Sequence, residues 1–324
     1  MQTYRFILRP LSAFGTPLVG DTLLGQLCWT LRYQLGNARL NELLKGYTGG
    51  QPFAVLSDAL PIGFLPLPNV PSASWQSPAT SEGLDRKALK KRKWLPVDGL
   101  ATPFVQWQSI AKSDVEVVRA DGVAAMERAQ PHNTINRRTG TTGQGQFAPY
   151  VMPQIWFDSA MQFDLYAVLD EDRLTLAELT AALQYIGNVG FGRDASIGLG
   201  KFVLQAAATP VTWHAPASAN AYLTLGPCAP QGLGLCPVRS TYQVVTRFGR
   251  HGDAAVQTGQ PFKRPVLLAK AGAVFWPEMM DSECQFIGQG LGGRDKPISL
   301  AMPETVQQGY APVVAISLPV EQTA

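Results

Sequence analysis

A glycine-rich stretch, residues 187–202 (GNVGFGRDASIGLGKF), has the residue types that bind a phosphate. Its glycines lack a Cβ, so backbone N–H groups there can turn outward and approach an anion closely. Two basic side chains add charge, and a serine adds a hydroxyl group. A glycine-rich turn that joins a helix to an edge strand without any ligand is the alternative. We predict phosphate contacts from seven residues of the stretch: Gly190, Gly192, Arg193, Ser196, Gly198, Gly200 and Lys201.

Two nucleotide-binding motifs resemble this stretch without fitting it. Gly190-x-Gly192-x-x-Ala195 matches the dinucleotide fingerprint as a string, but that fingerprint follows a strand and opens a helix. Here the expected order is a helix before the stretch and a strand after it. A P-loop requires a glycine and a Ser or Thr where this chain has Ala195 and Phe202. The sequence therefore predicts no nucleotide cofactor.

Positive charge also gathers in three other places. A basic run extends from Arg86 to Lys93 and is followed by Trp94. It can contact phosphates while the indole stacks on an unpaired base, or it can be a solvated surface. Arg137 and Arg138 stand in the polar stretch HNTINRRTGTTGQGQ, which is either a turn-rich loop or an RNA-binding arm. Four further cations either line a groove for RNA or solvate strand ends: Arg247, Arg250, Lys263 and Arg264.

Groups for acid–base or metal chemistry are scarce. Of three histidines, only His132 has neighbours that suit a general acid or base of a ribonuclease, and a stacking or hydrogen-bonding role is the simpler interpretation. Asp58 and Asp194 stand apart in the sequence and do not form the carboxylate cluster of a two-metal site. Asp194 is expected to pair with Arg193 and order the glycine stretch. We expect no catalytic residue and no metal site.

The elements that position these groups follow the order strand, helix, two strands (or a hairpin plus an insertion), helix, strand. A T-x-x-E capping box starts the second helix at Thr175 and Glu178, and glycines at 36 and 187 are expected to end the two helices. This order is that of the β-α-β-β-α-β, ferredoxin-like motif. The predicted ranges are Thr3–Arg9, Asp21 or Thr22 to Leu35, Phe53–Leu56, Ile62–Leu65, Met161–Leu169, Thr175–Ile186 and Lys201–Gln205.

Residues 68–150 interrupt this pattern with few long apolar segments, which predicts a long inserted arm. The second half holds strand patterns without a clear helix and is interpreted as a degenerate second copy. We therefore predict an α+β fold with two domains, residues 1–205 and 206–324. The predicted strands of the second domain are Ala221–Leu225, Tyr242–Arg247, Val266–Ala269, Ala273–Trp276 and Val313–Leu318.

Composition limits the function less than the motifs do. Charged residues make up 16% of the chain and the formal net charge is only +3, so nucleic-acid binding must be argued from where the charge lies. The four cysteines form no CxxC and no zinc-finger spacing, which favours buried thiols in a reducing cytosol. The N-terminus does not read as a signal peptide, and no apolar run is long enough to cross a bilayer. We expect a cytoplasmic protein with no membrane partner.

Four segments, in order, carry a resemblance to a known family. The glycine stretch after the second helix resembles the signature loop of the RAMP superfamily of CRISPR proteins. The likeness is to one branch of it, the Cas-five-like subunit of type III-A (Csm) effector complexes. It covers residues 1–205 well and the remainder weakly. The segments are SAFGTPLVGDTLLGQLCW, PFAVLSDALPIGFLP, HNTINRRTG with FAPY, and FGRDASIGLGKF.

The resemblance implies two ferredoxin-like (RRM-like, RAMP) domains and a non-catalytic role in antiviral defence. Such a subunit binds the 5′ tag of the crRNA and docks the large polymerase/cyclase-like subunit and the adjacent backbone RAMP subunit. Target RNA would be contacted indirectly. The alternatives are a RAMP-family endoribonuclease that processes crRNA and the equivalent subunit of a type III-B complex.

The resemblance also places the tag on this sequence. It implies tag contacts by the glycine stretch and by residues 132–138. The first helix can add backbone N–H groups at its N-terminus, where helices bind anions. The residues that these two segments add to the site are Gly20, Asp21, Thr22, His132, Asn133, Asn136, Arg137 and Arg138.

Overall fold

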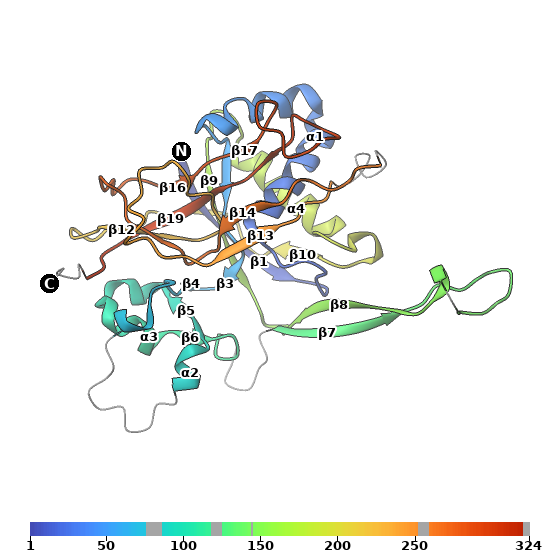
Figure 1. The fold of residues 1–324 in the computed structure, drawn as a ribbon, viewed down its shortest axis with the longest axis horizontal. Helices are drawn as coiled ribbons and strands as arrows, with labels where there is room; N and C mark the ends of the chain where they lie inside the picture. The colour runs from blue at the N-terminus through green and yellow to red at the C-terminus, as the bar shows by residue number, and fades with distance from the viewer. Residues whose placement is uncertain (76–85, 118–124, 144, 252–258, 320–324) are drawn as a thin grey trace.

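The computed structural model describes residues 1–75, 86–117, 125–143, 145–251 and 259–319 (Figure 1). The fold is α+β, as predicted, and most of its strands pair in antiparallel fashion. The larger sheet has the order β10-β1-β9-β2, with β11 beside β1 and β3 beside β9. Its strands are β1 (Gln2–Pro10), β2 (Ala54–Leu56), β3 (Leu60–Pro61), β9 (Phe163–Leu169), β10 (Phe202–Leu204) and β11 (Thr209–Pro210).

Two helices, α1 (Gly20–Leu44) and α4 (Leu176–Val189), pack against this sheet. Alternating residues of β1, such as Phe6 and Leu8, meet the apolar stripes of both helices in one core, where they are excluded from water. The strand order and the two helices are those of the predicted β-α-β-β-α-β motif. This core therefore fixes both ends of the glycine stretch, which lies between α4 and β10.

The helix ends differ from the prediction at two glycines. Gly36 does not end α1: it bends the chain with φ +87°, and the helix resumes to Leu44. The capping box of Thr175 and Glu178 is confirmed, but α4 continues past Gly187 and ends before Gly190. A Cβ at position 187 would lie 2.3 Å from the carbonyl oxygen of Phe202, so this glycine allows close packing of helix on strand.

The insertion predicted at residues 68–150 is not a simple loop. One part is a small three-stranded sheet, and its Leu95, Phe104 and Trp107 are buried. The other part is a two-stranded hairpin, β7 (Ala125–His132) with β8 (Tyr150–Phe157), which projects from the body and is called the arm below (Figure 1). The elements of the first part are β4 (Phe64–Pro66), β5 (Arg92–Pro96), β6 (Lys112–Ser113), α2 (Arg86–Lys90) and α3 (Trp107–Ile110).

The second half forms a four-stranded antiparallel sheet with the order β15-β12-β19-β16. No α-helix lies within residues 206–251 or 259–319, and the strand order differs from that of the first sheet. Two short pairs, β13 with β14 and β17 with β18, complete this half. Its strands are β12 (Ala221–Thr224), β13 (Val244–Arg247), β14 (Val266–Ala269), β15 (Val274–Phe275), β16 (Phe286–Gly288), β17 (Leu291–Gly292), β18 (Val306–Gln307) and β19 (Tyr310–Ile316).

The two halves share buried residues. Tyr310 of β19 belongs to the core of the first sheet. The side-chain amide of Gln308 bonds the backbone of edge strand β2 twice: it accepts from Leu56 N at 2.9 Å and donates to Leu56 O at 2.8 Å. The division at residue 205 stays a prediction.

Candidate nucleic-acid interface

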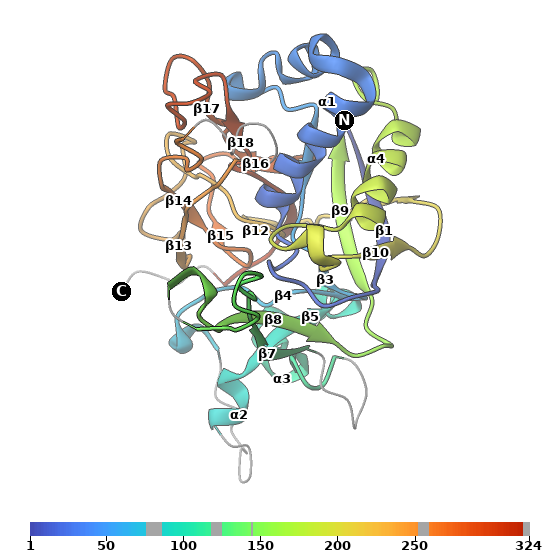
Figure 2. The same ribbon diagram turned by 90° about the vertical axis from the view of Figure 1, so that its right-hand side faces the viewer.

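Three segments singled out in the sequence lie on one side of the molecule. Figure 2 faces this side and shows the arm, the glycine stretch and the β13–β14 ribbon, with α1 between the last two. Hydrogen bonds join them: Gln26 of α1 donates to Gly190 O at 2.7 Å, and Arg193 donates to Pro153 O of the arm at 2.7 Å. Arg247 of the ribbon pairs with Asp21 of α1. The fold thus brings together three segments that are distant in the chain.

The backbone N–H groups of the glycine stretch are largely used within the protein. Phe191 N donates to Gly200 O at 2.9 Å, and Gly200 N donates to Ala13 O at 2.8 Å. Gly192 N donates to the side chain of Gln26 at 3.0 Å, and Gly198 N closes a turn. The expectation that these N–H groups turn outward is therefore wrong. Phosphate contact by this stretch stays a prediction that now depends on its side chains.

The glycines serve close packing of the chain on itself. A Cβ at Gly200 would lie 2.1 Å from the carbonyl oxygen of Phe191, and one at Gly190 would lie 2.4 Å from that of Leu199. Both glycines have positive φ, +75° and +115°. A larger residue at either position would have to displace backbone atoms.

The side chains of the stretch offer charge and a hydroxyl group to solvent. The predicted ion pair is confirmed, with Arg193 Nε 3.0 Å from Asp194 Oδ2, and about half of the Arg193 side chain remains exposed. Ser196 is exposed and Lys201 is partly exposed. Arg193 also bonds the arm, so its position depends on both segments.

The turn at the far end of the arm presents Arg137 and Arg138 to solvent. Asn136 orders this turn: its Oδ1 accepts from Arg138 N at 3.0 Å, and its carbonyl accepts from Gly140 N at 2.8 Å. Asn133 is exposed nearby. The two arginines therefore lie in an exposed turn at the end of a hairpin, and their contact with RNA stays a prediction.

His132 lies at the end of β7 and stacks on Tyr150 of β8. The ring centroids are 5.5 Å apart and the ring planes differ by 15°. Its Nε2 has no hydrogen-bond partner among the described residues. The stacking role favoured from sequence fits this geometry better than acid–base catalysis does, because no carboxylate bonds the ring within the described part of the chain.

The N-terminus of α1 faces the protein interior, contrary to the prediction of a phosphate contact there. Gly20 N donates to Asp58 Oδ1 at 2.9 Å, and a Cβ at Gly20 would lie 2.2 Å from the Leu56 carbonyl. Asp21 is buried, and Thr22 is partly buried. Burial raises the pKa of Asp21 and raises the pKa of Asp58 to about 7. The chain's own carboxylates therefore occupy the position proposed for a phosphate.

The four cations of the ribbon divide into two pairs. Arg247 points inward, with its Nε 3.1 Å from Asp21 Oδ2, and Lys263 is partly buried near α1. Burial lowers the pKa of Lys263. Arg250 and Arg264 are exposed. Only this second pair is placed to contact an external phosphate.

Part of the basic run, Lys90, Arg92 and Lys93, lines a cleft of about 590 Å³ at the base of the arm, together with Trp75 and Trp94. Part of its charge is already paired. Arg92 donates hydrogen bonds to the carbonyl oxygens of Gln108 and Ser109, and Lys93 forms an ion pair with Asp114. The cleft therefore brings cations and two indole rings together.

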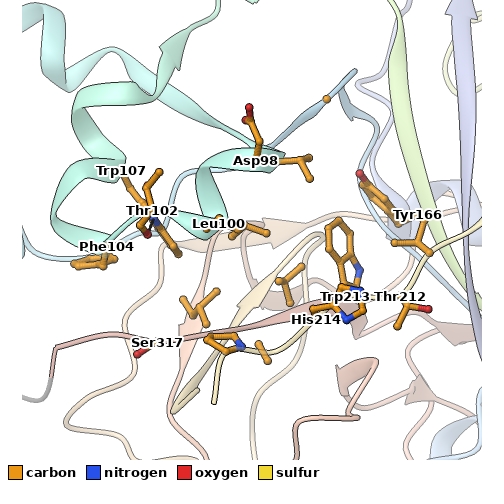
Figure 3. A pocket seen from close by; sticks show the side chains of 18 of the residues that line it. Asp98, Leu100, Thr102, Phe104, Trp107, Tyr166, Thr212, Trp213, His214 and Ser317 are labelled. Carbon is orange, nitrogen blue, oxygen red and sulfur yellow. Dashed lines mark hydrogen bonds between the residues drawn. The ribbon is translucent and has the colours of Figure 1, made fainter. Parts of the chain in front are cut away.

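A larger cleft of about 880 Å³ lies between the three-stranded sheet and the second half, and was not foreseen from the sequence (Figure 3). Its wall includes several aromatic side chains, among them Trp107, Tyr166 and Trp213. Trp213 Nε1 lacks a hydrogen-bond partner among the described residues. The residues come from six separate segments, so no spacing in the sequence marks this cleft.

Among the described residues, no group of three or more His, Cys, Asp or Glu lies close enough together to hold a metal ion. No helix of the described part is long and apolar enough to cross a membrane.

Comparisons with known proteins complete the description. No protein-family model and no curated protein matches the chain in sequence. Among solved structures, a chain of the "Csm1-Csm4 cassette in complex with pppApA" matches with a TM-score of 0.58 and 16% identity, over 98% of this chain and 99% of that one. A chain of the "Csm3-Csm4 subcomplex in the type III-A CRISPR-Cas interference complex" matches with a TM-score of 0.60 and 13% identity, over 97% and 99%.

The subunit that these two assemblies share is Csm4. This chain has the fold of Csm4. The resemblance found in the sequence is thereby confirmed at the level of the fold. The Csm4 likeness also extends over residues 206–319, where the sequence resemblance was weak.

Proposed function

We propose that this chain is the Csm4-like, non-catalytic subunit of a type III-A effector complex and that it holds the 5′ tag of the crRNA. One observation carries the proposal: the arm, the glycine stretch and the ribbon lie on one side of a Csm4 fold, and each of the three segments contains an exposed arginine. Arginines bind phosphates and fix the register of a nucleic acid. The setting would be antiviral defence in the cytoplasm.

The partners follow from the same likeness. Solved chains with this fold occur with Csm1 and with Csm3. We propose the corresponding large subunit and backbone RAMP subunit as partners here. The second half would be a degenerate RAMP domain that has kept a sheet and lost its helices, since residues 206–251 and 259–319 hold none.

The test is a filter-binding titration of the purified chain with RNA that carries the 5′ tag and with the same RNA after the tag is scrambled. We expect tighter binding to the tagged RNA. Arg137→Ala with Arg138→Ala removes two phosphate contacts, which should reduce the log–log salt slope by about 1.4 on a single strand. Lys45→Ala, exposed just beyond the C-terminal end of α1, is the matched control and should leave the slope unchanged.

Two results would contradict the proposal. Equal affinity for tagged and scrambled RNA would remove the tag-binding role. Specific cleavage of repeat RNA by the purified chain would overturn the non-catalytic role and favour a crRNA-processing endoribonuclease. In that case His132→Ala should lower cleavage on the order of 100-fold.

A further inference from the structure

The outer end of the β13–β14 ribbon exposes two phenylalanines. Phe248 and Phe262 are 72% and 66% exposed, although each belongs to a hydrogen-bonded part of the fold. Large rings at such exposure are costly in water, and clusters of them mark interaction sites. Nothing in the Csm4-like role described above uses these two rings.

The backbone places the two rings on one face. Arg250 and Phe262 stand opposite one another in an antiparallel bridge, and the flanking bonds run from Lys263 N to Gly249 O and from His251 N to Pro261 O, each 2.7 Å. Opposite residues share a face of a ribbon, and so do residues two apart along one strand. The face therefore holds two phenylalanines and two arginines in alternation: Phe248, Arg250, Phe262 and Arg264.

Burial confirms this assignment of faces. The intervening residues point toward the protein: Gly249 and Lys263 are partly buried and His251 is buried. His251 Nε2 lies 2.7 Å from Ser299 Oγ, which anchors the inner face. The inner face of the ribbon is thus held against the protein, and the outer face is directed toward solvent.

One of the rings already interacts with one of the guanidinium groups. The guanidinium carbon of Arg250 lies 5.7 Å from the ring centroid of Phe262, within the range of a cation–π contact. Arg250 and Arg264 have no carboxylate partner among the described residues. The face therefore offers flat apolar surfaces and uncompensated positive charge side by side.

Charge decides which kind of partner fits. Of the cations in residues 242–270, Arg250 and Arg264 lie on this outer face without a carboxylate partner among the described residues. Arg247 is instead paired with Asp21, and Lys263 faces inward. A partner for the outer face should therefore combine negative charge with flat apolar surfaces. Single-stranded RNA has both, because its bases stack on aromatic rings while its phosphates meet arginines.

We propose that the outer face of the ribbon is a stacking site for unpaired bases of single-stranded RNA, with Phe248 and Phe262 as the platforms and Arg250 and Arg264 on the phosphates. The proposal rests on the RNA-binding function above and adds a contact independent of the arm. Any base can stack there, since every base has a flat face. The site should hold RNA without reading its sequence.

The test uses leucine, which keeps apolar bulk and removes the ring. The variants are Phe248→Leu and Phe262→Leu, each compared with its tyrosine counterpart, and folding is checked by circular dichroism. The probe is a single-stranded RNA that carries 2-aminopurine, whose fluorescence is quenched when the base stacks. We expect each leucine variant to bind about 5-fold or more weakly with reduced quenching, and each tyrosine variant to bind like the parent protein.

The outcomes separate this site from tag recognition. Leucine variants that bind tagged and scrambled RNA more weakly by the same factor support the stacking site. The same loss in a parent protein without tag preference would also support it, while refuting the proposed function. Leucine variants with unchanged affinity and quenching would overturn the stacking site. Leucine variants that bind RNA normally and fail to join a Csm1-like or Csm3-like partner would assign the face to protein docking and overturn it as well.

Discussion

Replacing Arg247 with methionine is expected to destabilise the folded chain, not to remove an RNA contact. The Arg247 Nε atom lies 3.1 Å from Asp21 Oδ2, and the Asp21 side chain is 2% exposed. Removing one partner of a buried pair leaves the other charge uncompensated, at roughly 3–5 kcal/mol. Because the Arg247 side chain is 26% exposed, water can screen part of that charge. We therefore expect a loss of about 3 kcal/mol, at the low end of this range.

The assay is equilibrium unfolding in urea, followed over a double-mutant cycle. Asp21→Asn combined with Arg247→Met removes both charges and should recover most of the stability lost in Arg247→Met alone. The matched control is Arg250→Met, because Arg250 is exposed on the same ribbon. It should change stability by less than about 0.5 kcal/mol and weaken RNA binding.

The pH dependence gives a second readout of the same pair. Burial raises the pKa of Asp21, and loss of the guanidinium would raise it further. A carboxyl whose folded pKa is raised binds its proton more readily in the folded state, so stability falls as pH rises through the window between the two pKa values. Arg247→Met should therefore be least stable at high pH. An Arg247→Met protein that is as stable as the parent and has lost RNA affinity would refute the assignment of Arg247 to a structural pair.

Three further predictions concern the glycine stretch, the acidic pair and the arm. In urea unfolding, Gly200→Ala should lower the free energy of unfolding by about 3 kcal/mol or more, because its Cβ would lie 2.1 Å from a backbone oxygen. Gly198→Ala, at φ +96° with open space around it, should lower it by only about 1–2 kcal/mol. Equal losses in the two variants would contradict the packing role of Gly200. Burial raises the pKa of Asp58 to about 7, so the stability of the fold should fall as pH rises from about 4 to 7 and level off above pH 7. Asp58→Asn keeps an oxygen acceptor and should flatten this pH profile of stability. An unchanged profile in Asp58→Asn would be inconsistent with a raised pKa of Asp58. In limited proteolysis, trypsin should cut the free chain first at Arg137 or Arg138, and it should cut there much more slowly once guide RNA is bound. Equal cleavage rates with and without RNA would contradict the assignment of the arm to the RNA interface.

The first sheet could be predicted because its signals are local. Alternation from Thr3 to Arg9 marked β1, and the Thr175–Glu178 capping box marked the start of α4. The helix ends were not predictable in the same way. A glycine is equally suited to stop a helix or to bend it, and the contacts of the chain beyond Gly36 decided for a bend.

Candidate-site residues were predicted correctly where their placement depends on exposure alone. They were missed where their placement depends on contacts with residues distant in the chain. Arg137 and Arg138 sit in a polar turn whose exposure follows from composition. Arg247 was misassigned because its partner, Asp21, is 226 residues away in the sequence. Phe248 and Phe262 passed unnoticed, since an isolated phenylalanine in a strand usually belongs to a core. Only the pairing of the two strands shows that both rings face solvent.

The double hydrogen bond of Gln308 to Leu56 affects more than the local geometry of β2. Edge strands offer unpaired N–H and C=O groups that can recruit a strand from another molecule. The Gln308 amide occupies one such pair on β2 and comes from the other half of the chain. A fragment ending at residue 205 would lack this protection and would also expose the core surface that Tyr310 covers. Such a fragment should self-associate through β2.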